Sequence, residues 1–132
     1  DFGCYRERLV SLTKKGMDGA AEIKQMMRDF RGSPPLVLDG SPVIRIDDYQ
    51  TSISTDPRDG STQPIDLPGS NVLIYTTADG TRMAARPSGT EPKIKFYISV
   101  SGRIDTAEAY PRVTEELDRK IDRILEELKL NG

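Results

Sequence analysis

Alternating apolar and polar residues mark the clearest strand of this chain. The apolar members are Ile94, Phe96, Ile98 and Val100, and the polar members are Lys95, Tyr97, Ser99 and Ser101. A period of two places one set on each face of a strand. The pattern therefore predicts a half-buried strand over residues 94–101, with its apolar face packed on a core.

Two earlier stretches also have strand character. Residues 43–49 contain β-branched side chains that alternate with polar ones, and residues 71–77 form an apolar run. The Asp79-Gly80 pair that follows is a strong hairpin signal, so residues 81–85 are expected to pair back along residues 71–77. Asp47-Asp48 is interpreted as a strand end, because nothing nearby supplies the other oxygens that a hard cation needs.

Apolar residues at helical spacing predict a first helix over residues 19–31. Ile23, Met26, Met27 and Phe30 lie at i, i+3, i+4 and i+7, which places them on one helix face. Asp18 is the expected N-cap, and Gly32 followed by two prolines ends the helix. The methionine pair is interpreted as core packing and not as a ligand-binding face.

A second helix is predicted after residue 104. Asp105 and Glu108 have the spacing of a capping box, with the aspartate as the cap. The apolar stripe that follows consists of Val113, Leu117, Ile121, Ile124, Leu125 and Leu128. We expect this helix to end near Lys129, with its charged residues forming a solvated face that contains i,i+4 pairs.

Two stretches have no regular pattern. Residues 1–17 mix apolar and charged side chains, and we interpret them as a connection from a preceding domain with a short helix or strand near residues 5–12. Residues 51–70 are polar and rich in Pro, Gly, Ser and Asp, which indicates a long exposed loop. Within it, residues 56–60 are interpreted as a turn, because the later ligands of a calcium loop are missing.

The order helix, strand, hairpin, strand, helix indicates an α+β fold. We predict two layers, a largely antiparallel four-stranded sheet with two helices on one face. Residues 18–132 would form this domain. The loops at the strand ends would then be available to a ligand or partner.

Composition narrows the chemistry further. The 132 residues are enough for a single core, and no apolar run reaches the ~20 residues of a membrane span. The chain contains no histidine, which excludes catalytic Ser-His-Asp and Cys-His groups and histidine metal sites within it. The single cysteine, Cys4, excludes an internal disulfide, and we expect a cytoplasmic location.

Positive charge is concentrated in one region of an acidic chain. Residues 81–103 hold five basic side chains and one acidic side chain, a local balance of +4, whereas the whole chain has a net charge of −2. That overall charge argues against a nucleic-acid binder that works through net charge. The local excess suits a focused site for a small anion.

The chemistry at the centre of this region is that of an anion cradle. The stretch Arg86-Pro87-Ser88-Gly89-Thr90-Glu91-Pro92-Lys93 joins two predicted strands. Arginine offers a planar fork of charged donors, hydroxyls add donors, and glycine lets backbone N–H groups approach a ligand closely. From these residues alone, an ordinary solvated connection remains the alternative.

The same stretch resembles a signature of the α-D-phosphohexomutases. The similarity runs from Thr81 to Ile98 around the core Arg86-Pro87-Ser88-Gly89-Thr90, and it extends to Lys15–Ile23 and to the Asp79-Gly80-Thr81 hairpin. Within that superfamily, it is most similar to the C-terminal, fourth domain of the phosphoglucomutase/phosphomannomutase group. This resemblance implies a fold like that of the TATA-binding protein for the domain.

The resemblance also implies a function. Enzymes of this group are four-domain isomerases that interconvert hexose 1-phosphate and hexose 6-phosphate through a bisphosphorylated intermediate. A phosphoserine, a Mg²⁺ ion and a sugar-reading loop are expected in the other three domains. Carried over onto this sequence, Arg86, Ser88, Gly89 and Thr90 would clamp the phosphate that is not transferred, with Lys95 as a further basic contact.

No catalytic or metal-binding residue is therefore expected within these 132 residues. The predicted partners are the phosphosugar and the other domains of the parent enzyme, with hexose 1,6-bisphosphate as intermediate, and no nucleic acid or membrane. Alone, the chain would bind phosphate without turning substrate over. The alternative is a stand-alone module that binds an anion, a nucleic acid or a protein.

Overall fold

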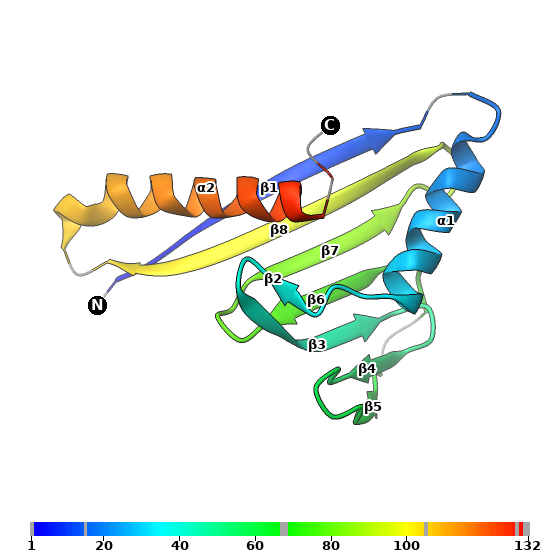
Figure 1. Cartoon of the computed structure of the whole chain (residues 1–132), viewed down its shortest axis with the longest axis horizontal. Coiled ribbons are helices and arrows are strands. Elements are labelled where there is room, and N and C mark those ends of the chain that lie inside the picture. Colours follow the sequence, from blue (N-terminus) through cyan, green and yellow to red (C-terminus); the bar gives the residue numbers. More distant parts are fainter. Residues whose placement is uncertain (1, 15, 67–68, 105, 129, 131–132) are drawn as a thin grey trace.

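Two helices cover one face of an antiparallel sheet in the computed structural model of the chain, which describes residues 2–14, 16–66, 69–104, 106–128 and 130 (Figure 1). The strands are β1 (Phe2–Thr13), β2 (Val37–Leu38), β3 (Ser41–Asp48), β4 (Ile53–Thr55), β5 (Thr62–Pro64), β6 (Leu73–Thr77), β7 (Arg82–Pro87) and β8 (Lys93–Ile104). The helices are α1 (Gly19–Gly32), the short 3₁₀ helix η1 (Ala107–Ala109) and α2 (Tyr110–Glu127). Neither α-helix has the length and apolar character of a membrane-spanning segment.

The sheet has the strand order β1-β8-β7-β6-β3-β4-β5, with β2 paired to β3, and every pair is antiparallel. The long strand β8 lies between β1 and β7 and organises the core. Its apolar residues Ile94, Phe96, Ile98 and Val100 are all buried on the helix side. The predicted α+β class, with both helices on one face, is confirmed.

Helix α1 packs as its apolar spacing predicts. Ile23 and Met27 are buried, and the Phe30 ring lies 5.8 Å from the ring of Phe96 and 6.2 Å from that of Tyr75. The Tyr75 hydroxyl donates a 2.7 Å hydrogen bond to the Phe30 carbonyl, so this core phenol has its polar atom satisfied. Burial raises the pKa of Tyr75. Asp18 occupies the N-cap position, but its side chain makes no capping bond.

Helix α2 begins later than predicted. Asp105, the proposed cap of a capping box, lies outside the described residues; η1 comes first, and α2 starts at Tyr110 with Pro111 in its first turn. The apolar stripe is confirmed, with Leu117, Ile121, Ile124 and Leu125 buried. The helix ends at Glu127, and the predicted end at Lys129 also falls outside the described residues.

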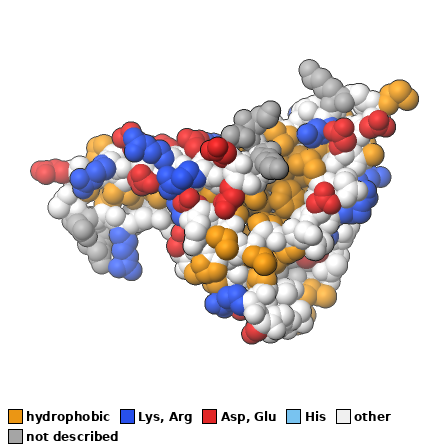
Figure 2. Space-filling model, in the orientation of Figure 1, with side chains coloured by type: hydrophobic (Ala, Val, Ile, Leu, Met, Phe, Trp, Pro, Cys, Tyr) orange, Lys and Arg blue, Asp and Glu red, His pale blue; other side chains and the backbone are white. Residues whose placement is uncertain are grey.

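Charged side chains gather along the outer side of α2, while apolar ones gather between the two helices (Figure 2). Arg119 pairs with Glu115 at 2.7 Å, which confirms the predicted i,i+4 pairing. Other charges on α2 have a second role: Asp122 pairs with Arg8 of β1, and Asp118 lies 3.6 Å from Arg6. The helix is therefore fastened to β1 by ion pairs.

A polar cluster fastens two turns to the same helix. The Lys120 ammonium lies 3.2 Å from the carboxylate of Asp39 and 2.9 Å from that of Asp79. Asp39 and Gly40, both with positive φ, form the turn between β2 and β3. Asp79 belongs to the predicted Asp-Gly hairpin between β6 and β7, which is confirmed.

The sheet has eight strands, and the predicted number of four is wrong. The largest difference is β1, for which only a short helix or strand near residues 5–12 was expected; it pairs with β8 along all twelve of its residues. It lacks a two-residue period because Arg6 and Arg8 occupy helix-side positions and meet aspartates of α2, whereas Leu9 is exposed on the other face. Whether residues 1–17 also connect to a preceding domain stays a prediction.

The second omission is in residues 51–70, which are not wholly a loop. They contain the short hairpin formed by β4 and β5, an exposed extension of the sheet edge. Because both strands bury little, their sequence carries no apolar pattern. The predicted turn at residues 56–60 joins these strands: the Asp56 carboxylate accepts hydrogen bonds from Arg58, which lower the Asp56 pKa to about 2.

Candidate functional site

The loop between β7 and β8 folds back on itself. The Ser88 amide donates a 2.8 Å hydrogen bond to the Lys93 carbonyl, which closes the turn. The Ser88 hydroxyl oxygen accepts hydrogen bonds from the amides of Thr90, at 3.4 Å, and Glu91, at 3.2 Å. Ser88 therefore organises the loop as an acceptor. None of the bonds between described residues uses its hydroxyl hydrogen, which is available to a ligand.

The far end of the loop rests on the segment that leads into α1. The Lys14 amide donates a 2.8 Å hydrogen bond to the Pro92 carbonyl. Gly19 is required at this contact, because a Cβ there would lie 2.3 Å from the Lys14 carbonyl oxygen and 3.0 Å from Pro92. The close approach of α1 thus helps to position the loop.

Two basic side chains lie opposite each other where the loop begins and ends. Arg86 of β7 pairs in register with Lys95 of β8, and both are exposed on the face of the sheet that no helix covers. Like charges directly opposite each other destabilise a sheet. Among the described residues, neither cation forms a salt bridge with a carboxylate, so their charge is not neutralised by the fold.

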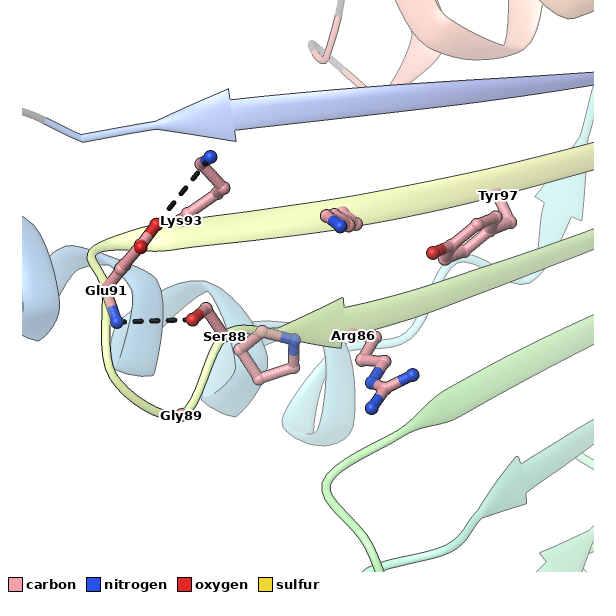
Figure 3. Close-up of a pocket in the computed structure, with 8 residues that line it drawn as sticks. Arg86, Ser88, Gly89, Glu91, Lys93 and Tyr97 are labelled. Carbon is pink, nitrogen blue, oxygen red and sulfur yellow. Dashed lines mark hydrogen bonds and ion pairs between the residues drawn. The ribbon is translucent and has the colours of Figure 1, made fainter.

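These cations border a cavity of about 370 Å³ (Figure 3). It is lined by Arg86, Pro87, Ser88, Gly89, Glu91, Lys93, Lys95 and Tyr97. Three cations and one carboxylate face this space, and the Glu91 carboxylate lies 3.7 Å from the Lys93 ammonium. The cavity therefore has an excess of positive charge and suits an anion.

Four of the five predicted site residues line this cavity, and Thr90 does not. Thr90 lines a second cavity, of about 400 Å³, on the other side of the loop, together with residues of α1 such as Ile23 and Lys24. Ser88 and Gly89 line both cavities. The loop thus separates the two spaces, with Arg86 and Lys95 on one side and Thr90 on the other.

Among the described residues, no contact requires glycine at position 89. A Cβ there would meet no atom within 4 Å, and its φ is not in the left-handed region. The backbone at Gly89 is therefore open to solvent, and a ligand can approach its N–H group from outside.

Four cavity residues were not among the predicted site residues. Tyr97 lies two residues after Lys95, and Lys93 two residues before it, so the alternation that predicts β8 places all three on one face. The other two are Pro87, at the end of β7, and Glu91, within the loop itself. The signal for Tyr97 and Lys93 was present in the sequence pattern.

No group of three or more His, Cys, Asp or Glu side chains that could hold a metal ion occurs in the described part of the chain. The adjacent carboxylates of β3 have arginine partners: Asp47 accepts from Arg45 at 2.9 and 3.0 Å, and Asp48 from Arg31 at 3.0 and 3.3 Å. Both aspartates belong to the strand, near or at its end.

Comparison with known proteins identifies relatives of one kind. The phosphoglucomutase of Staphylococcus epidermidis is 40% identical over 101 residues, which are 76% of this chain and 18% of that protein. The phosphoglucomutase of Staphylococcus aureus strain MRSA252 is 41% identical over 98 residues, again 18% of its length. That of Staphylococcus haemolyticus is 37% identical over 101 residues.

This chain therefore spans about 18% of the length of these relatives. No protein-family model matches it. Among solved structures, the open form of pp63/parafusin, a phosphoglucomutase from Paramecium, covers 95% of this chain and 21% of its own at 16% identity. The TM-score of this match is 0.32. The sequence relatives confirm the predicted resemblance, and the chain is related to a C-terminal part of the phosphoglucomutases within the α-D-phosphohexomutases.

Proposed function

We propose that this chain is the phosphate-binding C-terminal domain of a phosphohexomutase that interconverts hexose 1-phosphate and hexose 6-phosphate through a bisphosphate. The observation that carries the proposal is the Arg86–Lys95 pair, two cations without a carboxylate partner among the described residues, facing one cavity beside Ser88 and Gly89. The relatives named phosphoglucomutase supply the substrate class.

The residues of this cavity match the chemistry of a phosphate. Arg86 offers a planar fork of N–H donors, Lys95 a compact positive charge, and Ser88 a hydroxyl donor. A phosphate monoester carries roughly −1.5 to −2 charges near neutral pH. Each charge-assisted hydrogen bond to it is worth about 1.5–3 kcal/mol before the entropy of ordering the side chains is subtracted.

Thr90 would join this clamp only after the loop rearranges. The two bonds that hold the loop closed on the Ser88 oxygen are long, at 3.2 and 3.4 Å, so they are weak restraints. A phosphate at the loop could replace that oxygen as acceptor of the Thr90 and Glu91 amides. Phosphate binding would then reshape the loop, and the Thr90 hydroxyl would contact the same anion from the other side.

The role of this domain is to position substrate. Gripping one phosphate fixes the orientation of the sugar, which is a proximity contribution to the reaction of the parent enzyme. Phosphoryl transfer, and the Mg²⁺ that supports it, would belong to other parts of that enzyme, so the chain by itself would be inactive.

Calorimetric titration tests the proposal. Glucose 6-phosphate and inorganic phosphate should both bind the chain, and Arg86→Ala should weaken both by about tenfold or more. Arg82→Ala is the matched control, because Arg82 is exposed on the same strand and face but pairs with Ser99, away from the loop. The control should change affinity by less than twofold.

Three outcomes would count against the proposal. Equal losses in the two arginine variants would indicate attraction by general charge and not a site. Stronger binding of a single-stranded oligonucleotide than of glucose 6-phosphate at physiological salt would favour the stand-alone module. Clear turnover of glucose 1-phosphate by the chain alone would contradict its inactivity.

A further inference from the structure

An exposed aromatic side chain continues the proposed phosphate cavity along the sheet. Tyr97 is 43% exposed, although it lies in the middle of the long strand β8, which is paired on both sides. Its neighbours in sequence, Phe96 and Ile98, are buried beneath the helices. Figure 3 shows Tyr97 on β8 and Arg86 on the adjacent strand β7, with α1 behind the sheet. The ring therefore contributes nothing to the helix-side core.

The surroundings of Tyr97 leave its ring accessible. Its partner on β7 is Ala84, a small side chain, and its partner on β1 is Leu9, which is itself 53% exposed. No hydrogen bond joins the Tyr97 hydroxyl to another described residue. Tyr97 lines the proposed phosphate cavity and also lines another hollow, together with Glu7 and Leu9 of β1. The two spaces therefore meet at Tyr97.

We infer that Tyr97 is a contact for the sugar ring of the phosphohexose whose phosphate lies on Arg86 and Lys95. This inference rests on the proposed function and extends it from the phosphate to the sugar. Residues i and i+2 of a strand are about 6.6 Å apart, so Tyr97 follows Lys95 at about that distance along β8. That spacing is comparable with the reach from the phosphate to the pyranose ring in one hexose phosphate.

The chemistry of a tyrosine fits this position. The C–H groups on one face of a pyranose pack on an aromatic ring, and the phenol hydroxyl donates to or accepts from a sugar hydroxyl. Arg86 and Lys95 would hold the phosphate group of the ligand, and Tyr97 would limit the rotation of the sugar about that group. Such a contact recognises a six-membered ring and not phosphate alone, so it separates hexose phosphates from smaller phosphate esters.

The test compares two ligands in three variants of the chain by calorimetry. Tyr97→Ala should weaken glucose 6-phosphate about three- to tenfold and leave inorganic phosphate within twofold. Tyr97→Phe should retain most of the affinity for the sugar phosphate, because the ring face remains. Tyr5→Ala is the matched control: Tyr5 is 67% exposed on the same face, but it pairs with Ser101 farther along β8. It should change neither affinity.

The possible failures are distinguishable. If glucose 6-phosphate and inorganic phosphate bind and depend on Arg86, but Tyr97→Ala weakens neither or both equally, the sugar contact is wrong and the proposed phosphate site stands. If neither ligand binds the unaltered chain, both proposals fail. If a single-stranded oligonucleotide binds and Tyr97→Ala abolishes that binding, the ring stacks on bases and the sugar contact is overturned.

A structural measurement keeps the inference testable if an alanine variant is destabilised. In the folded Tyr97→Phe variant, glucose 6-phosphate should shift the amide NMR resonances of Leu9 and Ala84, which flank the ring, and inorganic phosphate should leave them in place. Shifts confined to the loop residues with both ligands would overturn the contact.

Discussion

The two faces of the sheet use charge in opposite ways. On the helix-covered face, cations meet carboxylates, as Arg8 meets Asp122 and Lys120 reaches two turn aspartates. On the open face, Arg86 and Lys95 oppose each other in register, and no carboxylate in the described part of the chain neutralises them. Charges of the first kind stabilise the fold, whereas those of the second kind oppose it. The proposed phosphate ligand would account for their presence.

The largest expected effect comes from adjacent residues of β8 that point to opposite faces. Phe96 is fully buried and contacts Phe30, so Phe96→Ala should lower the free energy of unfolding by about 3–5 kcal/mol. Lys95→Ala should change it by less than about 0.5 kcal/mol, because the side chain is exposed. Urea unfolding measures both.

Binding should show the reverse order. Lys95→Ala should reduce the affinity for glucose 6-phosphate by roughly tenfold, the loss of one charge-assisted contact. A loss of stability in Lys95→Ala as large as that in Phe96→Ala would contradict the division between the two faces.

A glycine at the base of the loop should have the next largest effect. Gly19→Ala forces a Cβ toward the Lys14 carbonyl oxygen and should destabilise the chain by about 1–3 kcal/mol. Gly32→Ala is its control at the other end of α1, where a Cβ meets no atom within 4 Å. That change should be neutral or stabilising by up to about 1 kcal/mol. Equal thermal unfolding of the two variants would show that the close contact at Gly19 does not constrain α1.

The charged cluster on α2 should have an effect of about 1–3 kcal/mol when its central cation is removed. The Lys120 side chain is only 15% exposed and bridges Asp39 and Asp79, so Lys120→Met leaves two carboxylates without this partner. Guanidinium unfolding near neutral pH measures the loss. Arg119→Met, on the exposed side of the same helix, is the control and should have little effect.

This cluster also predicts a dependence of stability on pH. The hydrogen bond from Arg123, opposed by burial and helped by Lys120, holds the pKa of Asp39 below the ordinary 3.8. Burial raises the pKa of Asp79, but hydrogen bonds from Thr77, Lys120 and Thr81 lower it more, and the net pKa is also low. As the pH falls, the carboxylates of Asp39 and Asp79 therefore become protonated in the unfolded chain at a higher pH than in the folded chain.

Stability from the cluster is therefore complete above about pH 4 to 5 and is lost as the pH falls through 3.8 toward the lower folded-state pKa values. Urea unfolding at pH 6 and pH 3 should show a smaller acid loss in Lys120→Met than in the unaltered chain. An equal acid loss in both would assign the pH dependence to other carboxylates.

The smallest effect is expected from Glu91, whose carboxylate is the one among the described residues that line the cavity beside Arg86 and Lys95. It lies beside Lys93 on the exposed surface, where an ion pair is worth about 1 kcal/mol or less. Glu91→Gln removes a charge that repels an entering phosphate and should raise the affinity for inorganic phosphate about two- to fivefold. The gain should diminish at high salt. Glu7→Gln, on the same face but outside this cavity, should have a smaller effect, and equal gains would indicate general charge.

The sequence predicted those elements whose burial differs between the two sides. The alternation in β8 and the helical spacing in α1 follow directly from the helix-side core. The predicted helix over residues 19–31 is observed as Gly19–Gly32, and the predicted strand over residues 94–101 is observed as Lys93–Ile104. Strand β1 was expected only as a short helix or strand near residues 5–12, because its helix-side positions include arginines that form ion pairs. Strands β4 and β5 were missed because they bury little. In those strands, backbone pairing and charge replace apolar packing.

The structure brings most of the predicted site residues together, and their binding to phosphate stays a prediction. Arg86, Ser88, Gly89 and Lys95 do line one cavity, while Thr90 lies across the loop. Which side of a short turn a side chain occupies depends on the dihedral angles of each loop residue, and residue type alone does not fix these. Tyr97 could have been included, since strand alternation already placed it beside Lys95.

The pairing of β1 with β8 has a consequence for how the chain folds. Residues 2–13 pair with residues 93–104 along twelve consecutive register positions, and α2 packs across both strands. Contacts so distant in sequence require a large loop to close before they gain any energy, and they slow folding. The hairpin of β6 and β7 is local by comparison, so it can form first, and β8 can then pair with β7. In this order of folding, the Arg86–Lys95 pair would be assembled at the second step, before β1 pairs with β8.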